Sequence, residues 1–499
     1  MPIYQSIRGN LSIWRNVRFF MEEKRNKREK RKPTTLQALF PIVFMFVILG
    51  VGYGYLGLAT EVLIVISCIA AGCMAYYLGY SWQELIDAAV QKVADTLSAT
   101  FILWSVGFLI GGLMFCGAIP MIINYGIQIV NPRFMLVTAF LSSALLSIVT
   151  GTSWGAAGTI GVAMMGIAGG LGVSLPATAG AVVSGSFFGD KLSPLSDTTN
   201  LAPMAAGSNL YEHIKHMLYT TVPASIVALV VYLIVGLKTD GALVTPENVE
   251  LMISQLHDMF RFNPIILIPF ILVIAGSLLK WPTIPTMLCA GLLGIVLGIT
   301  VQGFSLSDGC ASLISGFNVS MTGFTGEPSP DILNLLNRGG VNSVISTTVL
   351  VFVAMAFAGI VSVSGMLDKV LELLLKHVHT VTGLIGSTIL ACFTVALTTG
   401  SSYLSILVPG QLFKDAYAKK GLAAKNLSRT LEDSGTVIVP LVPWSAAGAY
   451  MAVTLGVPTL SYLPWAIMNY TGILFAVILS VTGIGIAKIK TDEKTTASQ

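Results

Sequence analysis

Two short segments of the sequence place glycine beside hydroxyl residues inside otherwise apolar stretches. One extends from Thr150 to Trp154 with the sequence TGTSW, and the other from Thr399 to Tyr403 with the sequence TGSSY. A broken backbone at such a glycine frees carbonyl oxygens, and carbonyl and hydroxyl oxygens are ligands that hard cations prefer. The alternative is a helix-packing glycine with hydroxyls bonded to their own backbone. We expect cation ligands at Thr152, Ser153, Ser401 and Ser402.

Charged residues interrupt two further apolar segments. Between positions 187 and 203 the chain carries two carboxylates, one ammonium and several hydroxyls, and a shorter acidic cluster begins at Glu432. A charged group at the centre of a bilayer costs roughly 2.5 to 3.5 kcal/mol even on lenient scales, so such clusters indicate a functional site. Asp197 and Asp433 occupy equivalent places and are the leading carboxylates. The other expected ligands for cation or proton are Ser196, Thr198, Glu432 and Ser434.

These carboxylates predict a coupling mechanism. Desolvation favours a protonated carboxyl group and a bound cation favours the ionised form, so one site can exchange Na⁺ for H⁺. Asp190 and Lys191 are expected to take part in a structural or gating ion pair; because neighbours on a regular helix do not face each other, a partner of Asp190 elsewhere in the chain is the alternative. The aromatic residues beside the breaks are expected to close a gate or pack the tips, with substrate contact as the alternative; they are Trp154, Tyr403 and Trp444.

The histidines are expected to be plain surface residues, because all of them fall in loops or at the ends of apolar runs. A role in pH sensing is the alternative for two pairs, His213 with His216 and His377 with His379. These residues are His213, His216, His257, His377 and His379.

The composition excludes a soluble globular enzyme. Of the 499 residues 54% are hydrophobic and only 10% are charged, whereas soluble proteins carry about 25% charged residues. Residues 1–33 hold ten Lys and Arg against three acids and predict a basic cytosolic extension rather than a secretory signal. Six scattered cysteines indicate neither a metal site nor disulfides. We expect no cofactor and no nucleic-acid partner; the bilayer is the expected surrounding.

Apolar runs long enough to cross a bilayer are expected near 38–56, 61–79, 98–118, 218–237, 263–279, 283–300, 344–365 and 466–487. The two glycine segments match at an offset of about 249 positions, and the acidic clusters follow in the same order, which indicates two repeats. The predicted organisation is a basic extension (1–33), a first repeat (34–237), an external linker (238–262), a second repeat (263–487) and a cytosolic tail (488–499).

The distribution of Lys and Arg predicts that the repeats are inverted. Five basic residues follow the second glycine segment between 414 and 429, whereas residues 134–190, which contain and follow the first glycine segment, hold no Lys or Arg. Because loops rich in Lys and Arg stay in the cytoplasm, equivalent loops lie on opposite sides. The expected fold is all-α and polytopic, with about ten transmembrane helices, two re-entrant helical hairpins, broken helices at the midplane and both termini in the cytoplasm.

The motifs resemble those of the NhaC-type Na⁺/H⁺ antiporters over about residues 38–487. The specific part is Phe188-Gly189-Asp190-Lys191-Leu192-Ser193-Pro194-Leu195-Ser196-Asp197, supported by the first glycine segment and by Pro440-Leu441-Val442-Pro443-Trp444. This resemblance implies inverted repeats, two opposed hairpins, a homodimer with a moving transport domain, and residence in the plasma membrane.

The expected function is extrusion of Na⁺ in exchange for H⁺ by alternating access, without enzyme activity. A Na⁺-coupled exchanger of malate or lactate is the main alternative within the resemblance, but the acidic pair at Glu432 and Asp433 would repel a dicarboxylate. An intramembrane aspartyl protease is a remote alternative, because Phe187 departs from the Gly-x-Gly-Asp pattern. A channel would conduct without obligatory counter-ion movement.

Overall fold

The computed structural model describes residues 30–53, 55–238, 246–376, 378 and 380–489. Within these residues the secondary structure is helical, and the sole extended pairing is an isolated bridge between Leu422 and Lys488. The chain divides into two compact units, one formed by residues 1–92 and 356–370 and the other by 93–355 and 371–499. We describe each unit by itself.

The smaller unit is built from three helices of the N-terminal part of the chain and a helical segment that returns from further along it. Its α2 starts with a capping box, in which the Gln37 side chain accepts from the Thr34 amide at 2.9 Å. Gly359 lies against the Ala88 carbonyl, where a Cβ would come within 2.5 Å. Its helices are α2 (Thr35–Gly52), α3 (Thr60–Tyr77), most of α4 (Trp82–Asp95), and parts of α18 (Ile345–Val363) and α19 (Met366–Lys376).

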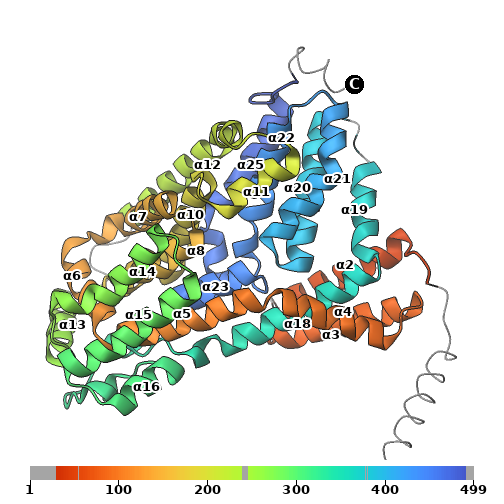
Figure 1. Cartoon of the computed structure of the whole chain (residues 1–499). Helices are drawn as coiled ribbons and strands as arrows, with labels where there is room; N and C mark the ends of the chain where they lie inside the picture. Colours follow the sequence, from red (N-terminus) through yellow and green to blue (C-terminus); the bar gives the residue numbers. More distant parts are fainter. Residues whose placement is uncertain (1–29, 54, 239–245, 377, 379, 490–499) are drawn as a thin grey trace, which may run out of the picture. The chain divides into compact units, whose positions relative to one another are not determined.

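The larger unit contains the remaining helices (Figure 1). They are α5 (Leu97–Phe115), α6 (Ala118–Ile129), α7 (Met135–Thr150), α8 (Ser153–Ala156), α9 (Val162–Gly170), α10 (Leu175–Leu192), α11 (Asp197–Ala206), α12 (Leu210–Lys238), α13 (Pro246–Met259), α14 (Ile268–Leu278), α15 (Thr283–Leu297), α16 (Leu306–Ser315), α17 (Pro330–Leu336), α20 (Val381–Thr399), α21 (Ser402–Lys419), α22 (Ala424–Leu431), α23 (Ala446–Leu455), α24 (Thr459–Tyr462) and α25 (Ile467–Thr482). Short 3-10 or π-helical turns lie at Pro132–Phe134, Ala157–Gly161, Pro264–Leu267, Gly298–Gln302, Val319–Thr322, Val341–Val344, Glu432–Thr436, Val439–Leu441 and Leu463–Trp465.

Small residues bring the helices of this unit close together. A Cβ at Gly185 or Gly189 of α10 would come within 2.4 Å of a backbone carbonyl of α7, so the two helices pack backbone to backbone (Figure 1). The same holds where Gly112 of α5 meets Gly291 of α15. Close approach through glycine is typical of helices that pack within a membrane, where burial of apolar surface gives little drive.

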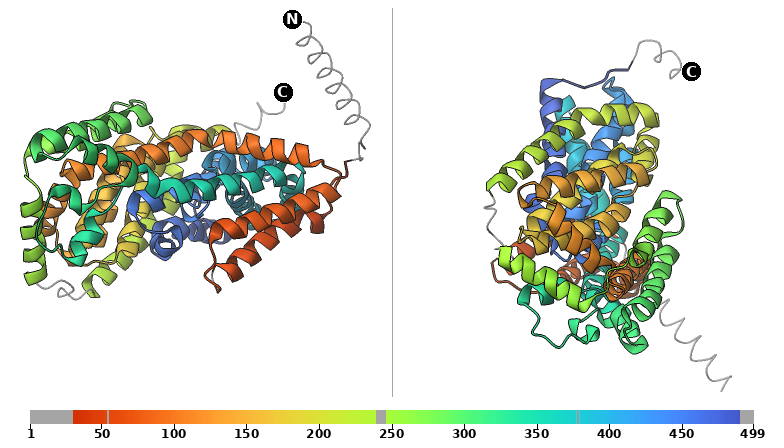
Figure 2. Two further views of the ribbon diagram at one scale, coloured as in Figure 1. Left: turned by 90° about the horizontal axis from the view of Figure 1, so that it is seen from below. Right: turned by 90° about the vertical axis from the view of Figure 1, so that its left-hand side faces the viewer.

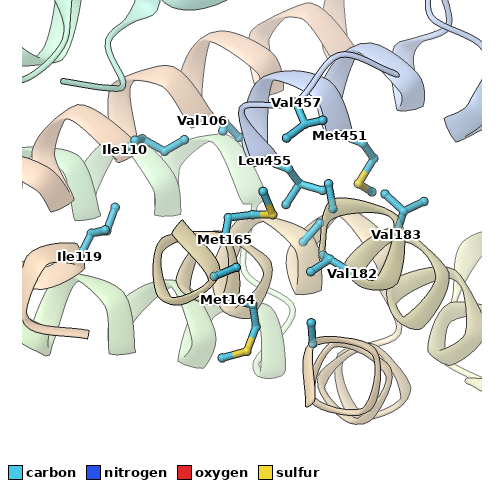
Figure 3. Packing of buried hydrophobic residues seen from close by; sticks show 14 of the residues in the cluster. Val106, Ile110, Ile119, Met164, Met165, Val182, Val183, Met451, Leu455 and Val457 are labelled. Carbon is cyan, nitrogen blue, oxygen red and sulfur yellow. The ribbon is translucent and has the colours of Figure 1, made fainter. Parts of the chain in front are cut away.

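Buried apolar side chains of α5, α6, α9, α10 and α23 meet in one cluster, which Figure 3 shows from close by. Met164 and Met165 of α9, Val182 of α10 and Leu455 of α23 belong to this cluster and are labelled in Figure 3. This cluster joins helices of the two predicted repeats, because α10 belongs to the first and α23 to the second. The two views of Figure 2 show the same interleaving of early and late segments in the larger unit.

The structure confirms a polytopic helical protein. Among the described residues, eight helices are long and apolar enough to cross a membrane, or up to eleven spans if each bent pair is one span. A helix occurs at every apolar run expected from the sequence. The repeat boundaries, the inverted orientation and the re-entrant depth of the hairpins stay predictions. Most of the predicted basic extension, part of the linker and nearly all of the tail lie outside the described residues.

Candidate functional site

The two glycine segments adopt the same local conformation. Gly151 follows α7 with φ of 71°, and Gly400 follows α20 with φ of 60°, a left-handed conformation that ends a helix and that glycine adopts without strain. The next residue caps a new helix in each case: Thr152 accepts from the Gly155 amide at 3.2 Å, and Ser401 from the Leu404 amide at 3.4 Å. The predicted breaks are therefore confirmed, and both caps use the expected hydroxyls.

The first charged segment contains a break between two helices, α10 and α11. Helix α10 ends at Leu192, and Ser196 caps α11 by accepting from the Thr199 amide. Thr199 donates to the Asp190 carbonyl, which the break frees, at 2.9 Å, and Ser193 donates to the Ile148 carbonyl in the last turn of α7 at 2.8 Å. Such internal partners are what non-helical backbone needs at membrane depth.

The second charged segment is interrupted too, but more gradually. A π-helical turn over Glu432–Thr436 follows α22, and the chain bends by 50° before α23. Three side chains donate to carbonyls of this interrupted stretch: Ser405 to Gly435 at 2.7 Å, Asn469 to Val437 at 2.8 Å, and Ser445 to Val439 at 2.6 Å. The break is thus buried in protein and held by hydrogen bonds from neighbouring helices.

A cavity of about 480 Å³ lies where both glycine segments meet the first charged segment. Its lining includes Asp95, at the end of α4, and Thr436, from the second charged segment. Its lining holds three aspartates and many hydroxyls, and it includes no Lys, Arg or His. The expected site residues found in this lining are Thr152, Ser153, Trp154, Asp190, Ser196, Asp197, Thr198, Ser401, Ser402 and Tyr403.

The two aspartates of the first charged segment have different surroundings. Asp190 is 6% exposed, and its carboxylate accepts a hydrogen bond from the Ser153 hydroxyl at 3.1 Å. Asp197 is exposed at the start of α11, where the Tyr403 hydroxyl donates to it at 3.5 Å. Both carboxylates are therefore linked across the cavity to a residue of a glycine segment.

Lys191 forms an ion pair, but its partner is Asp433 and not Asp190. The Lys191 ammonium lies 2.5 Å from the Asp433 carboxylate, and both side chains are fully buried. Thr220 of α12 donates to the same carboxylate oxygen at 3.1 Å. Asp190 has no Lys or Arg within ion-pair distance among the described residues. The expected pairing of Asp190 with Lys191 is thus wrong, because successive helical residues point about 100° apart.

The remaining acids and aromatic residues lie outside the lining of the cavity. Glu432 is fully buried, and neither of its carboxyl oxygens has a hydrogen-bond partner among the residues that the structure describes. The Ser434 hydroxyl donates to the Thr430 carbonyl, and the indole of Trp444 donates to the Leu397 carbonyl at 2.8 Å. Trp444 thus packs against α20 near its tip.

Trp154 belongs to the cavity lining and also stacks on another ring. Its indole lies 4.4 Å from the ring of Tyr450 on α23, whose hydroxyl donates to the Trp154 carbonyl at 2.7 Å. The first glycine segment is thereby fixed to the second predicted repeat.

Sequence reasoning missed three polar residues of α12. His213 is fully buried and its Nδ1 lies 2.9 Å from the Ser428 hydroxyl, and His216 is 6% exposed. The expectation that these two histidines are surface residues is wrong, because α22 and the chain after α25 cover them. Their spacing with Thr220, three and four residues apart, places all three on one helical face and was the available signal. His257 is exposed, and His377 and His379 lie outside the described residues.

Comparison with known proteins supplies the family. The family model described as the Na⁺/H⁺ antiporter family matches residues 35–199 and 185–484. A protein of Haemophilus influenzae named as an uncharacterized Na⁺/H⁺ antiporter is 50% identical over 92% of this chain and 98% of its own length. The Na⁺/H⁺ antiporter NhaC of Alkalihalophilus pseudofirmus is 35% identical over 92% of this chain and 98% of its own.

A third relative has a different substrate in its name. The malate-2H⁺/Na⁺-lactate antiporter of Bacillus subtilis is 33% identical over 91% of this chain and 96% of its own length. Matches of this extent cover the glycine segments and both charged segments. The chain belongs to the Na⁺/H⁺ antiporter family.

Proposed function

We propose that this protein exchanges Na⁺ for H⁺ across the membrane by alternating access. Membership of the Na⁺/H⁺ antiporter family supports this proposal, as does the name of the 35% identical relative. The observation that carries it is the cavity lining, with three aspartates and no Lys, Arg or His among its residues. Such a lining attracts a cation, and its hydroxyl and carboxylate oxygens are ligands of the hard type that Na⁺ prefers.

The proposed cation site lies between Asp190 and the tips of the hairpins. Asp190 is buried and already accepts from Ser153, so a cation there would meet a carboxylate and a hydroxyl whose oxygen has a free lone pair. Asp197 adds a second carboxylate at the same cavity. Two carboxylates close together favour either one cation or one proton between them, which is the competition that exchange needs.

Asp433 has a different place in the proposal. The Lys191 ammonium and the Thr220 hydroxyl both contact one oxygen of its carboxylate, so a cation already holds the place that Na⁺ would take. The other oxygen has no hydrogen-bond partner among the described residues and is the atom that we propose to receive the transported proton. A proton on Asp433 would remove its negative charge and leave the ammonium without a partner. The adjacent Glu432, buried without a hydrogen bond, is the second candidate for carrying a proton.

Five helix N-termini at the cavity favour one other candidate function. The helices α8, α11, α15, α21 and α23 begin at residues that line the cavity. Helix N-termini bind anions, and transporters use them for substrate carboxylates. A Na⁺-coupled carboxylate exchanger, as the name of the Bacillus relative describes, is therefore the second candidate.

The lysines of the larger unit support the proposed orientation. Lys414 lies beside Gly207, Lys425 pairs with Glu212 at 3.3 Å, and Lys488 bridges to Leu422. These contacts gather the three lysines at one end of the unit, and positive residues favour the cytoplasmic side. We propose that this end and both termini face the cytoplasm of a plasma-membrane protein, and that two copies form a homodimer.

The two candidate functions separate in proteoliposomes that contain an internal pH dye. Na⁺, K⁺, malate and lactate are added singly and in pairs to vesicles that hold a pH gradient. Dissipation by Na⁺ alone supports the Na⁺/H⁺ antiporter, whereas dissipation that requires an organic acid together with Na⁺ replaces it with the carboxylate exchanger. Protein-free vesicles set the leak.

A variant of Asp190 tests the site itself. Asp190→Asn removes a charge worth a few kcal/mol to a bound cation, so the Na⁺ concentration at half-maximal rate should rise by roughly tenfold or more. The matched control is Asp415→Asn, which neutralises an exposed aspartate on α21. If both variants reach the half-maximal rate at the same Na⁺ concentration, the cation does not bind at Asp190.

A further inference from the structure

Helices α12 and α22 hold a line of polar contacts that leads inward from the surface of the larger unit. Glu212 pairs with Lys425 at 3.3 Å, the His213 ring lies 2.9 Å from the Ser428 hydroxyl, and Thr220 donates to Asp433 at 3.1 Å. The partners are 213, 215 and 213 positions apart, so the two segments run side by side in the same direction. We name these six residues, together with His216 and Arg429, the polar seam.

Exposure falls along the seam from one end to the other. The side chains of Glu212 and Lys425 are 62% and 28% exposed, whereas Asp433 and its partner Lys191 are fully buried. Glu212 and Thr220 are eight residues apart, which is about 12 Å along a helix. The seam therefore connects solvent with the buried ion pair.

The middle of the seam holds ionisable groups with unused hydrogen-bonding atoms. His213 Nε2, both ring nitrogens of His216, and Nε and Nη2 of Arg429 have no partner among the described residues. Arg429 is fully buried and donates through Nη1 to the Gly485 carbonyl at 3.0 Å. Buried polar groups without partners are rare, and α12 is otherwise strongly apolar. Packing alone does not account for two histidines there.

We propose that the polar seam is the path by which the transported proton travels between solvent and Asp433. The proposal rests on the proposed exchange of Na⁺ for H⁺. Imidazole is suited to such a step because it can accept a proton at one ring nitrogen and release one from the other. One proton enters from the end at Glu212, passes through the imidazoles, and neutralises the Asp433 carboxylate. Movement of the proton in the other direction returns Asp433 to its ionised form.

Positive groups surround the imidazoles and limit the seam to one proton at a time. The Lys191 ammonium of α10 opposes a positive charge on His213, and Arg429 and Lys425 of α22 oppose one on His216. Two imidazolium ions beside three cations would repel each other, so a proton that arrives is passed on rather than stored.

The test compares two kinds of transport in proteoliposomes. The variant His213→Gln/His216→Gln keeps polar side chains but removes both proton carriers, and the matched control is His257→Gln, an exposed histidine on α13. Exchange of Na⁺ for H⁺ is followed with an internal pH dye, and exchange of ²²Na⁺ for Na⁺, which moves no net proton, is followed by isotope uptake. Imidazole buffer is then added as a diffusible proton carrier.

The expected result is a loss of roughly tenfold or more in the maximal rate of Na⁺/H⁺ exchange, with unchanged ²²Na⁺ exchange and partial rescue by imidazole. A full rate of Na⁺/H⁺ exchange in the variant would overturn the proposal. So would an equal loss of both kinds of exchange in folded protein, because the histidines would then act structurally. The single variants His213→Asn and His216→Asn provide the same comparison if the double variant does not fold. Absence of Na⁺-dependent proton movement in the unaltered protein would instead refute the proposed function.

Discussion

Removing the charge of Lys191 should destabilise this protein more than any exposed charge change. The ammonium lies 2.5 Å from Asp433, and neither side chain is exposed. Lys191→Met leaves a buried carboxylate with the Thr220 hydroxyl as its remaining donor. Breaking a buried ion pair by removing one partner typically costs about 3 to 5 kcal/mol, because the remaining charge is uncompensated.

Neutralising both partners should recover most of that loss. In Lys191→Met/Asp433→Asn no charge remains, and the amide can still accept from Thr220. Buried pairs replaced together by neutral groups are often close to neutral in stability. We therefore expect each single variant to lose about 3 to 5 kcal/mol and the double variant to lose less than either, which is a strong coupling between neighbouring sites.

The measurement is equilibrium unfolding in mixed micelles of a mild detergent and SDS, followed by tryptophan fluorescence. Lys425→Met is the control, because the Lys425 pair with Glu212 is longer and partly exposed and should contribute at most about 1 kcal/mol. Additive losses in the double variant would refute the ion pair as a coupled unit. If Lys191→Met lost no more stability than Lys425→Met, the buried position of Lys191 would be refuted.

Two further changes test the folded structure. Gly151→Ala should destabilise more than Gly303→Ala, because both glycines have positive φ but only the former would place its Cβ within 2.6 Å of Leu195; we expect about 1 to 2 kcal/mol for Gly303 and more for Gly151 in the same unfolding assay. In the smaller unit the hydrogen bond from Lys30 lowers the pKa of Glu84, so the stability that this carboxylate contributes is present at neutral pH and is lost as the pH falls through the carboxyl range. Glu84→Gln should thus lower the thermal midpoint at neutral pH and not at about pH 3, where the carboxyl group is largely protonated. The effect should be small, because both side chains are well exposed.

The apolar runs and the glycine segments were sufficient to predict most of the helical architecture. Length and hydropathy give the spans, because each must cross the same thickness of hydrocarbon. The breaks after Thr150 and Thr399 followed from a glycine with a hydroxyl residue behind it, and both positions have the left-handed glycine and the cap. The division into compact units did not follow, because part of α18 packs with α4, hundreds of residues away in the chain.

The candidate site was predicted less completely, because it depends on contacts between distant helices. Sequence order made Asp190 the neighbour of Lys191 and made Asp197 equivalent to Asp433. The fold instead pairs Lys191 with Asp433, 242 positions apart, and turns Asp190 to Ser153. Helical periodicity could have placed the polar residues of α12 on one face, but only the tertiary structure shows what that face meets.

Charged residues of each predicted repeat contact residues of the other repeat, and these contacts limit how the protein can move. Lys191 of the first repeat pairs with Asp433 of the second, and Tyr403 of the second repeat donates to Asp197 of the first. A motion that separated the two charged segments would leave an ammonium and a carboxylate buried and apart, at a cost of several kcal/mol. A motion that carried both segments together would keep the pair intact at every stage. The alternating access that we propose is therefore expected to move the two charged segments as one body, because this keeps the buried pair intact.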